Sequence, residues 1–268
     1  MEKYCRNCGN HGHLYHECNN PILSYGIIIY YKDKDDKIEI VMIERKDSLA
    51  FIEFMRGKYY NIHNHDYIQL IINRMTIKEK ELLLNNDFDD LWKILWGDTN
   101  KINNKIKREY TKSKYLFNNL KNQKIYNLEY FISHSNTNYS ENEWEIPKGR
   151  RENYENNRDC AIREVYEETN VSKDKYSLLE NIIPLNEEYT GINRVRYKHN
   201  YYIGRANDKF KVEILQSNTH QISEVKSIEW LDKEKCFNKI REYDSMKQGV
   251  ITKFFDFIEN VDKYGNLE

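Results

Sequence analysis

A glycine followed by a loop and an acidic helix, at residues 149–171, constrains this chain more than any other segment. The segment reads GRRENYENNRDCAIREVYEETNV. On a helix, Glu164, Glu167 and Glu168 stand at positions i, i+3 and i+4, so their carboxylates share one face. Like charges gathered on one face are unfavourable unless cations neutralise them, and the hard ions Mg²⁺ and Mn²⁺ prefer oxygen ligands. The segment therefore predicts a divalent-metal site built on one helix.

The remainder of this predicted helix suits packing against a sheet. Ala161, Ile162, Val165 and Tyr166 form its apolar face. Asn170 follows the helix end, where a left-handed backbone is common and Asn is the usual substitute for Gly. The competing interpretation is a solvated helix with accidental acidic clustering, since acidic pairs are frequent in helices.

A second motif, CRNCGNHGHLYHEC, opens the chain with three of its five cysteines. Three thiolates and one imidazole satisfy tetrahedral Zn²⁺, and Gly9 and Gly12 allow tight turns between the ligands. A segment this short has no core, so Zn²⁺ would supply most of its folding free energy. The predicted zinc ligands are Cys5, Cys8, His13 and Cys18.

This motif resembles the CCHC zinc knuckle of nucleocapsid and other RNA-binding proteins. Such knuckles stack an unpaired base on an apolar residue after the first cysteine, whereas this chain has Arg6 there, with Leu14 at the second apolar position. Tyr4 and Tyr15 are the nearby candidates for stacking. Two roles stay open: contact with single-stranded RNA, or a zinc-stapled cap docked on the main domain.

Composition sets wide bounds on the rest of the chain. A length of 268 residues allows one large domain or two smaller ones, and a net charge of −1 means that any basic surface is local. No apolar run approaches 18 residues, and Met1 opens no signal-peptide pattern, so we expect a soluble intracellular protein without membrane contact. Cys160 and Cys236 are expected as buried thiols.

The order of predicted elements is that of a sheet interrupted by helices. Two strands, at 24–31 and 37–44, precede a helical stretch with a capping box at 76–79 and a helix at 88–96. Trp92 and Trp96 are expected in a core. The sheet is then expected to resume with further strands and a closing helix, at residues 128–134, 143–146, 177–189, 194–205, 225–230 and 245–262.

A one-signed basic run occupies residues 101–125, with eight Lys or Arg against the single acid Glu109. A solvated helix face is the usual form of such a run. Interleaving with Tyr110, Tyr115 and Phe117 instead favours a track for an RNA backbone. The predicted RNA-binding residues are Lys101, Lys105, Lys107, Arg108, Lys112, Lys114, Lys121 and Lys124.

The sequence around the acidic helix resembles the Nudix hydrolases. WEIPKG at 144–149 and DCAIREVYEET at 159–169 are similar to the mRNA-decapping members, and the order of elements is similar to the decapping Nudix enzymes of large nucleocytoplasmic DNA viruses such as poxviruses, African swine fever virus and giant viruses. The resemblance implies an α/β Nudix sandwich (α/β/α) with a mixed sheet. The expected divisions are the zinc knuckle 1–21, the first Nudix strands 22–47, a helical insertion and candidate RNA-binding lobe 48–126, and the remaining Nudix domain 127–268.

The resemblance also implies roles for particular residues. Glu164, Glu167 and Glu168, with the backbone carbonyl of Gly149, would ligate catalytic Mg²⁺ or Mn²⁺. In the family, a salt bridge equivalent to one between Glu155 and Arg163 holds the loop against the helix.

Further candidates surround this box. Glu224, six residues before Trp230, is the candidate fourth acid, and its competing interpretation is an exposed glutamate at a strand edge. Either Glu168 or Glu224 would act as general base. The residues expected to hold non-reacting phosphates are Lys148, Arg150 and Arg151.

The resemblance implies removal of the 7-methylguanosine cap from mRNA, releasing 7-methylguanosine diphosphate and 5′-monophosphate RNA. A cationic base calls for aromatic stacking, for which Phe54 and Tyr189 are the candidates. The alternatives are hydrolysis of small diphosphates, such as inositol pyrophosphates or nucleoside diphosphate derivatives, and a non-catalytic RNA-binding protein with a relic box. For a viral protein, we expect action in the host cytoplasm or viral factory, or packaging in the virion.

Overall fold

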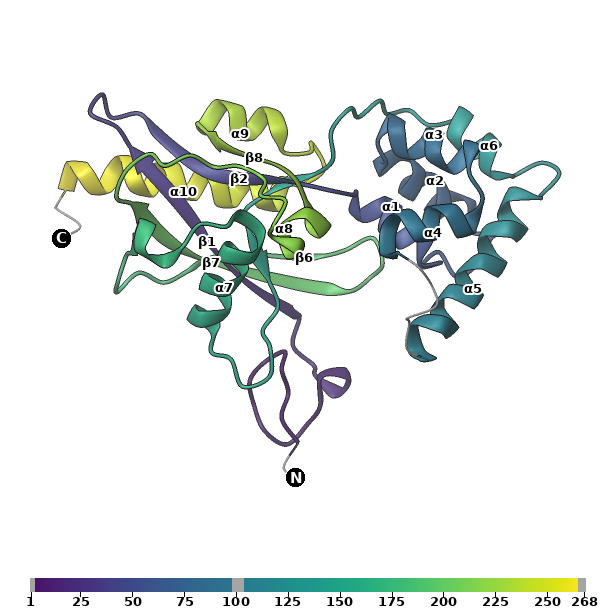
Figure 1. Ribbon diagram of the computed structural model, residues 1–268, viewed down its shortest axis with the longest axis horizontal. Coiled ribbons are helices and arrows are strands. Elements are labelled where there is room, and N and C mark those ends of the chain that lie inside the picture. Colours follow the sequence, from purple (N-terminus) through teal and green to yellow (C-terminus); the bar gives the residue numbers. More distant parts are fainter. Residues whose placement is uncertain (1–2, 98–103, 265–268) are drawn as a thin grey trace. The chain divides into compact units, whose positions relative to one another are not determined.

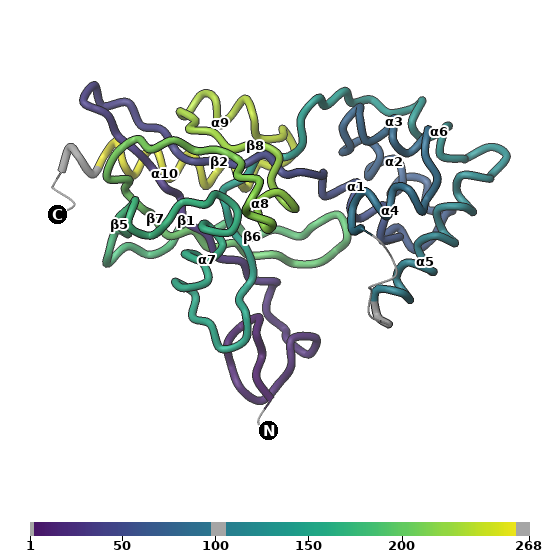
Figure 2. The backbone as a smooth tube through the Cα atoms, in the orientation of Figure 1, coloured from purple at the N-terminus to yellow at the C-terminus, as the bar shows by residue number. Residues whose placement is uncertain are grey.

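The computed structural model describes residues 3–97 and 104–264, and the chain divides into two compact units. The first unit combines Met1–Lys46 with Glu143–Glu268, and the second is Asp47–Asn142. Figures 1 and 2 trace both units along the chain. Lys101 of the predicted RNA-binding set lies outside the described residues, as does the side chain of Lys105.

The first unit is built on a mixed sheet. Its central pair is parallel, β1 with β7, and β2 lies antiparallel to β1 on the other side. The path of the sheet runs β3-β2-β1-β7-β5, while β4 pairs with β1, β6 with β7 and β8 with β2. The strands are β1 Ile22–Lys32, β2 Ile38–Arg45, β3 Trp144–Glu145, β4 Lys148–Gly149, β5 Tyr176–Leu178, β6 Leu185–Thr190, β7 Arg196–Ala206 and β8 Val225–Leu231.

Helices cover both faces of this sheet, as Figure 1 shows. Along β1, Ile27 and Ile29 pack with helix α7 on one face, while Ile28 and Tyr30 pack with helix α10 on the other. This alternation has the period of a strand, and burial on both faces explains why β1 reads as one continuous apolar run. The helices of the unit are α7 Asn157–Thr169, α8 Thr219–Glu224, α9 Lys233–Lys239 and α10 Ser245–Tyr264, with 3-10 turns η1 Tyr15–Glu17 and η3 Lys173–Lys175.

The second unit is helical around its own aromatic core. The predicted capping box is confirmed: Thr76 Oγ1 accepts from the Glu79 amide at 3.2 Å, and Glu79 Oε2 accepts from the Thr76 amide at 2.8 Å. Phe51, Phe88 and Phe117 are each at most 2% exposed. The helices are α1 Leu49–Met55, α2 His65–Arg74, α3 Ile77–Asn85, α4 Phe88–Trp96, α5 Asn104–Lys121 and α6 Leu128–Ser133.

Several predicted elements need correction. The strand expected at 128–134 is wrong, because Asn127 caps helix α6 by accepting from the Tyr130 amide at 2.8 Å. The strand expected at 177–189 is interrupted between β5 and β6, where Asn181 adopts φ +59°. Trp92 is buried as predicted, but Trp96 is 38% exposed at the end of α4.

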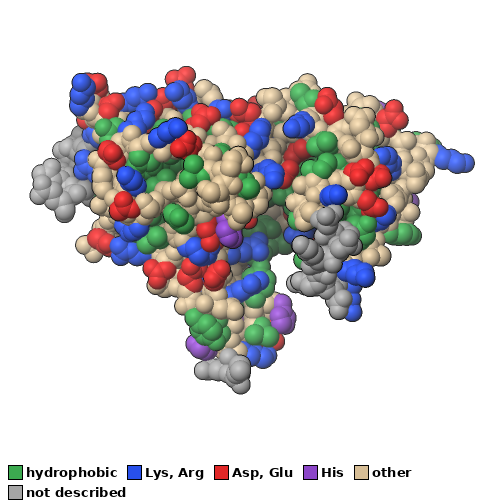
Figure 3. Space-filling model, in the orientation of Figure 1, with side chains coloured by type: hydrophobic (Ala, Val, Ile, Leu, Met, Phe, Trp, Pro, Cys, Tyr) green, Lys and Arg blue, Asp and Glu red, His purple; other side chains and the backbone are tan. Residues whose placement is uncertain are grey.

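The surface charge, the buried cysteines and the character of the helices can each be compared with what the composition predicts. Lys or Arg side chains are interspersed with Asp or Glu over the face drawn in Figure 3, in keeping with the net charge of −1. Cys160 and Cys236 are both fully buried, as predicted. Among the described residues, no helix combines the length and the apolar character needed to cross a membrane.

Candidate active site

Helix α7 carries the acidic residues and is closed by polar caps at both ends. Asn156 accepts from the Asp159 amide at 2.8 Å at its start. Asn170 follows its end with φ +59°, and its amide donates to the Tyr166 carbonyl at 2.8 Å. The left-handed conformation predicted for Asn170 is therefore confirmed, and the helix is fixed in length on both sides of the acids.

One side of α7 packs on the sheet. Ala161 and Val165 are fully buried there, as predicted. The packing predicted for Tyr166 is wrong, since its side chain is 50% exposed. Glu168, one turn beyond Val165, is buried instead. The buried face of α7 therefore includes this acid, and Tyr166 lies outside that face.

Two of the three acids contact the short strand β4, and the third is held by Arg163. The Glu164 carboxylate lies directly against Gly149: a Cβ added to this glycine would stand 2.0 Å from Glu164 Oε2. Glu168 is 6% exposed, and its Oε2 accepts from the Lys148 amide at 2.7 Å. Glu167 Oε2 accepts from Arg163 at 2.9 Å. A larger residue at 149 would displace the Glu164 carboxylate from this position.

Arg163 ties the loop before α7 to the helix. Its Nε and Nη2 donate to the two carboxylate oxygens of Glu155 at 2.8 and 2.9 Å. Nη2 also donates to the Arg150 carbonyl at 2.9 Å, and Nη1 donates to Glu164 at 2.8 Å and Glu167 at 2.9 Å. One guanidinium group therefore orients both the loop and two of the acids.

The electrostatics show a site short of positive charge. Burial raises the pKa of Glu164 to about 7; Arg163 opposes this shift, and the charges of Glu167 and Glu224 add to it. Burial likewise raises the pKa of Glu168 well above its usual range. Carboxylates in this condition gain stability from a bound cation, and an all-oxygen donor set suits a hard divalent ion.

Glu224 belongs to the same acidic neighbourhood. It is the last residue of α8, directly before β8, rather than part of a strand, and its side chain is exposed. Its carbonyl accepts from the Lys46 amide at 2.8 Å. Helix α8 packs against α7, and the charge of Glu224 adds to the raised pKa of Glu164.

The predicted phosphate-binding residues separate into different surroundings. Lys148 Nζ donates to Glu145 Oε2 at 2.6 Å and is nearly buried, and Arg45 donates to the other oxygen of Glu145 at 2.7 Å. Burial acts to raise the pKa of the Glu145 carboxyl, but the charges of Lys148 and Arg45 outweigh it and hold that pKa below its usual range. Sequence reasoning missed Arg45 and Glu145, because their pairing depends on the register of β2 with β3.

The two arginines after Gly149 diverge. Arg150 has an exposed side chain, whereas Arg151 is only 9% exposed. The Arg151 guanidinium donates to the Asn7 carbonyl at 2.7 Å and lies 5.8 Å from the centre of the Tyr25 ring. Arg151 is thus directed toward the N-terminal knuckle and not toward Lys148.

The knuckle residues gather as a ligand set. The ligand atoms of Cys5, Cys8, His13 and Cys18 all lie within 4.8 Å of one another. With Zn–S bonds of about 2.3 Å, the ligand atoms of a tetrahedral site lie roughly 3.8 Å apart, so this set fits Zn²⁺ after small adjustments. Gly9 and Gly12 adopt φ +79° and +97°, the left-handed turns that only glycine adopts freely.

The two aromatic candidates for stacking differ in access. Phe54 is 1% exposed, and its ring lies 5.0 Å from that of Tyr59 inside the second unit's own core. Tyr189 is half-buried on β6 and stacks on Tyr197 of β7, with ring centres 5.4 Å apart. Next to it, Glu187 accepts from His199 at 2.6 Å.

The basic run forms α5 and presents part of its charge to solvent. Lys114 pairs with Asp89 at 2.5 Å, and Lys121 donates to the Asn86 carbonyl at 2.8 Å, so these two are held to their own unit. Tyr60, which sequence reasoning missed, is 61% exposed under the Lys112 ammonium, 4.5 Å from the ring centre. The exposed members of the predicted set are Lys107, Arg108, Lys112 and Lys124.

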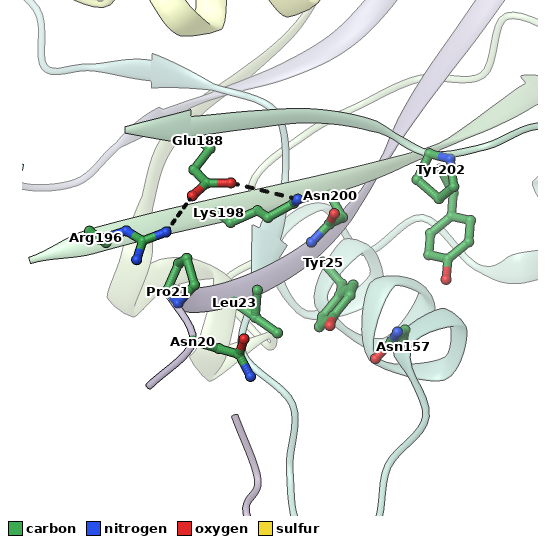
Figure 4. Close-up of a pocket in the computed structure, with 11 residues that line it drawn as sticks. Asn20, Pro21, Leu23, Tyr25, Asn157, Glu188, Arg196, Lys198, Asn200 and Tyr202 are labelled. Atoms are coloured by element: carbon green, nitrogen blue, oxygen red, sulfur yellow. Dashed lines mark hydrogen bonds and ion pairs between the residues drawn. The ribbon is translucent and has the colours of Figure 1, made fainter. Parts of the chain in front are cut away.

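A polar pocket of about 450 Å³ opens beside the knuckle linker. Figure 4 shows Asn20 and Pro21 of the linker on one side and Asn200 of β7 on another, with Asn157 at the start of α7. Glu188 in this pocket is paired with Arg196 at 2.9 Å. The lining residues come from β1, β7, α7, the linker, and β6 with the preceding Pro184, and the box acids are not among them.

Comparison with known proteins places this geometry in a family. A model of the NUDIX domain matches residues 129–251. A putative mRNA-decapping protein of Acanthamoeba polyphaga mimivirus is 30% identical, over 96% of this chain and 94% of its own length. The mRNA-decapping protein g5R of African swine fever virus is 28% identical, over 86% of this chain and 93% of its own length. The chain belongs to the Nudix hydrolase family, whose members use divalent metal ions.

A solved structure is also similar at lower identity. The Ap4A hydrolase of C. elegans is 14% identical, with a TM-score of 0.46, over 89% of this chain and 98% of that one. The family match and the sheet covered by helices on both faces confirm the predicted α/β Nudix class and the resemblance to the viral decapping proteins.

Proposed function

We propose that this chain removes the 7-methylguanosine cap from mRNA in a metal-dependent hydrolysis, releasing 7-methylguanosine diphosphate and 5′-monophosphate RNA. The nearly full-length likeness to viral proteins named for mRNA decapping supports the substrate. The packing of the Glu164 carboxylate on Gly149 supports the reaction and is the observation that carries it, because it sets an acidic cluster beside the backbone of the box loop.

We assign metal binding to Glu164, Glu167 and Glu168 together with the Gly149 carbonyl. Bound Mg²⁺ or Mn²⁺ would neutralise phosphate charge and lower the pKa of a coordinated water. Arg163 keeps Glu164 and Glu167 in place through two hydrogen bonds near 2.8 and 2.9 Å.

A proton acceptor completes the reaction. Either Glu168 or Glu224 accepts the proton of the attacking water as the phosphoanhydride is cleaved. The two roles separate experimentally, since a ligand contributes to metal affinity and a pure base does not. Glu224→Gln should keep Mn²⁺ affinity and lose activity if Glu224 is the base, and Glu168→Gln should lose both if Glu168 is a ligand.

Phosphate and cap contacts follow from placement. Lys148, held by Glu145, and the exposed Arg150 flank the box glycine and would contact phosphates that do not react. The cationic cap base requires an aromatic face, for which Tyr189 on β6 and Tyr197 on β7 are the candidates. Phe54 is left out of this set because it lies in a hydrophobic core.

The RNA body is assigned to the exposed face of α5. Lys107, Arg108 and Lys112 lie in one solvent-facing stretch with Tyr115, which is 66% exposed. The single acid of this run, Glu109, is bound by Arg56 at 2.8 Å, which leaves the face more positive. Cations with exposed aromatic rings suit an RNA backbone with unpaired bases. For a protein with viral relatives, this substrate implies action on mRNA in the infected cell.

The test is product analysis on RNA labelled in the cap, with Mg²⁺ or Mn²⁺. Wild type should release 7-methylguanosine diphosphate, Glu168→Gln should reduce the rate by about 10³-fold or more, and uncapped RNA should compete. Glu259→Gln, on the exposed surface of α10, is the matched control and should behave as wild type. Faster turnover of inositol pyrophosphates, without inhibition by RNA, would reject the proposal.

A further inference from the structure

Arg151 occupies a closed slot between the knuckle and the sheet. Its guanidinium donates to the Asn7 carbonyl at 2.7 Å and lies over the Tyr25 ring. It also packs against Gly9, where an added Cβ would stand 2.4 Å from Arg151 Nη1. The Asn7 carbonyl, the Tyr25 ring and Gly9 together hold the Arg151 guanidinium in one position. The hydrogen bond to Asn7 is charge-assisted, which makes it stronger than one between neutral groups.

Asn7 connects this arginine to the cysteine ligands. It lies between Cys5 and Cys8 in the chain, and its side-chain amide donates to Cys18 Sγ at 3.3 Å and to the Pro21 carbonyl at 2.9 Å. The same side chain accepts from the Leu23 amide of β1 at 2.9 Å. The carbonyl that binds Arg151 therefore moves only if the ligand set or the start of β1 moves.

A second contact joins the knuckle to the catalytic loop. Tyr4 stacks on Tyr154 with ring centres 4.5 Å apart and planes 22° apart. Tyr154 adopts φ +64° in the loop before α7, an unusual conformation for an aromatic residue. Figure 1 shows this loop running beside the N-terminal segment.

The loop that bears Arg151 reaches the box acids through its neighbour. The Arg150 carbonyl accepts from Arg163 at 2.9 Å, and Arg163 in turn holds Glu164 at 2.8 Å. Each step from Cys18 through Asn7, Arg151 and Arg163 to the Glu164 carboxylate is a hydrogen bond or a single peptide link.

We propose that Arg151 is a positioning residue for the catalytic loop, and that the metal-loaded knuckle works through it as a strut that holds residues 150–156 in the conformation the box acids need. The activity arm of this inference rests on the decapping function proposed above. The Cys/His set fits zinc, and a segment of this size folds only around its metal, so loss of the metal releases the strut.

The test compares Arg151→Gln with Arg158→Gln in the full-length, zinc-loaded protein. Arg158 is an exposed arginine of α7 paired with Glu180 at 2.6 Å, so it offers the same chemical change nearby on the surface. The first readout is hydrogen exchange of the backbone amides of 150–156. Exchange there should rise about tenfold or more in Arg151→Gln and stay unchanged in Arg158→Gln, with β1 and α10 protected in both.

The second readout is turnover of a cap dinucleotide, which lacks an RNA body. Arg151→Gln should lower kcat on the order of 10- to 100-fold, with KM little changed. Cys8→Ser, which removes a zinc ligand, should produce the same two effects. The double variant should be no worse than either single one, because both break the same strut.

Unchanged loop exchange in Arg151→Gln would overturn the proposal. So would normal dinucleotide turnover in both variants with a loss only on long RNA, since the knuckle would then contact RNA instead. If the wild-type protein does not cleave capped substrates at all, the decapping proposal fails, and the exchange measurement still decides the role of Arg151. Tyr154→Ala supplies an independent variant of the same interface and should raise loop exchange in the same segment.

Discussion

Helices α7 and α5 are both densely charged, yet they hold their charges in opposite ways. On α7, Glu168 is 6% exposed and Glu164 lies against a glycine, each with a defined partner. On α5, Lys107, Arg108 and Lys112 face solvent. In sequence, each helix carries an excess of one charge, acidic on α7 and basic on α5, and burial distinguishes how the two hold it.

The difference separates two uses of charge. Burial raises the pKa of Glu164 to about 7, so α7 holds its acids in a state that a divalent ion relieves. Salt screens the attraction between exposed cations and charges that lie more than about 10 Å away. Such cations suit contact with a flexible polyanion better than they suit a fixed reacting centre. We therefore assign the chemical step to the first unit and backbone affinity to the second.

Gly149→Ala disturbs the buried acids of α7 and should have the largest effect of the changes compared. The added Cβ would lie 2.0–2.3 Å from the three atoms of the Glu164 carboxyl group, which must move. We expect kcat/KM on capped RNA to fall about 10³-fold or more. Gly249→Ala on α10, where a Cβ meets no atom within 4 Å, is the control and should keep full activity. Wild-type activity in Gly149→Ala would contradict the close packing.

Phe54→Ala tests whether the second unit has an aromatic core independent of cap binding. Phe54 is 1% exposed, so we expect loss of about 3–5 kcal/mol in the free energy of unfolding, measured by denaturant titration. Tyr115→Ala, at a site 66% exposed, should change stability by less than about 0.5 kcal/mol. A Phe54→Ala protein of normal stability with weakened cap binding would return this residue to the cap site.

The buried acids should make metal stabilisation depend on pH. The Glu164 pKa of about 7 lies above its unfolded value, so the metal-free folded state binds the extra proton and loses stability as pH rises from about 4.5 to 7. The loss approaches about 3 kcal/mol. Stabilisation by Mg²⁺, read from thermal unfolding, should therefore be larger at pH 8 than at pH 5. Glu164→Gln should reduce that difference, with Glu168 supplying the remainder, and an equal gain at both pH values in wild type would contradict the burial of these charges.

Neutralising the exposed face of α5 should have the smallest effect, and it should change RNA binding without changing turnover. The triple change of Lys107, Arg108 and Lys112 to Gln should reduce the salt slope of RNA binding by roughly 2, while turnover of a cap dinucleotide stays unchanged. The same change at three exposed lysines elsewhere, Lys34, Lys78 and Lys253, should leave the slope near wild type. Equal slopes for the two triples would make α5 an ordinary solvated face.

Local patterns were sufficient for much of the box. Helical spacing alone placed Glu164, Glu167 and Glu168 on one side of α7, and the left-handed Asn170 follows from the chemistry of helix ends. The strand at 24–31 was predicted from its continuous apolar run, which agrees with the burial of β1 on both faces.

Features that depend on distant segments could not be read. The Arg45–Glu145 pair requires the register of two strands a hundred residues apart, and the turn of Arg151 toward Asn7 requires a docked knuckle. Residues 128–134 have the apolar content of a strand, but the cap at Asn127 and the i, i+3 burial of Leu128 and Phe131 make them a helix. Phe54 was misplaced because aromatic residues of cores and of binding sites look alike in sequence.

Binding of Mn²⁺ by the zinc-loaded protein, freed of other divalent ions and followed by electron paramagnetic resonance, tests most directly whether the box acids form one cation site. Wild type should bind Mn²⁺, the Gln variants of Glu164, Glu167 and Glu168 should each weaken this binding, and Glu259→Gln should not. Mn²⁺ affinity that survives all three substitutions unchanged would mean that these carboxylates do not hold the catalytic ion.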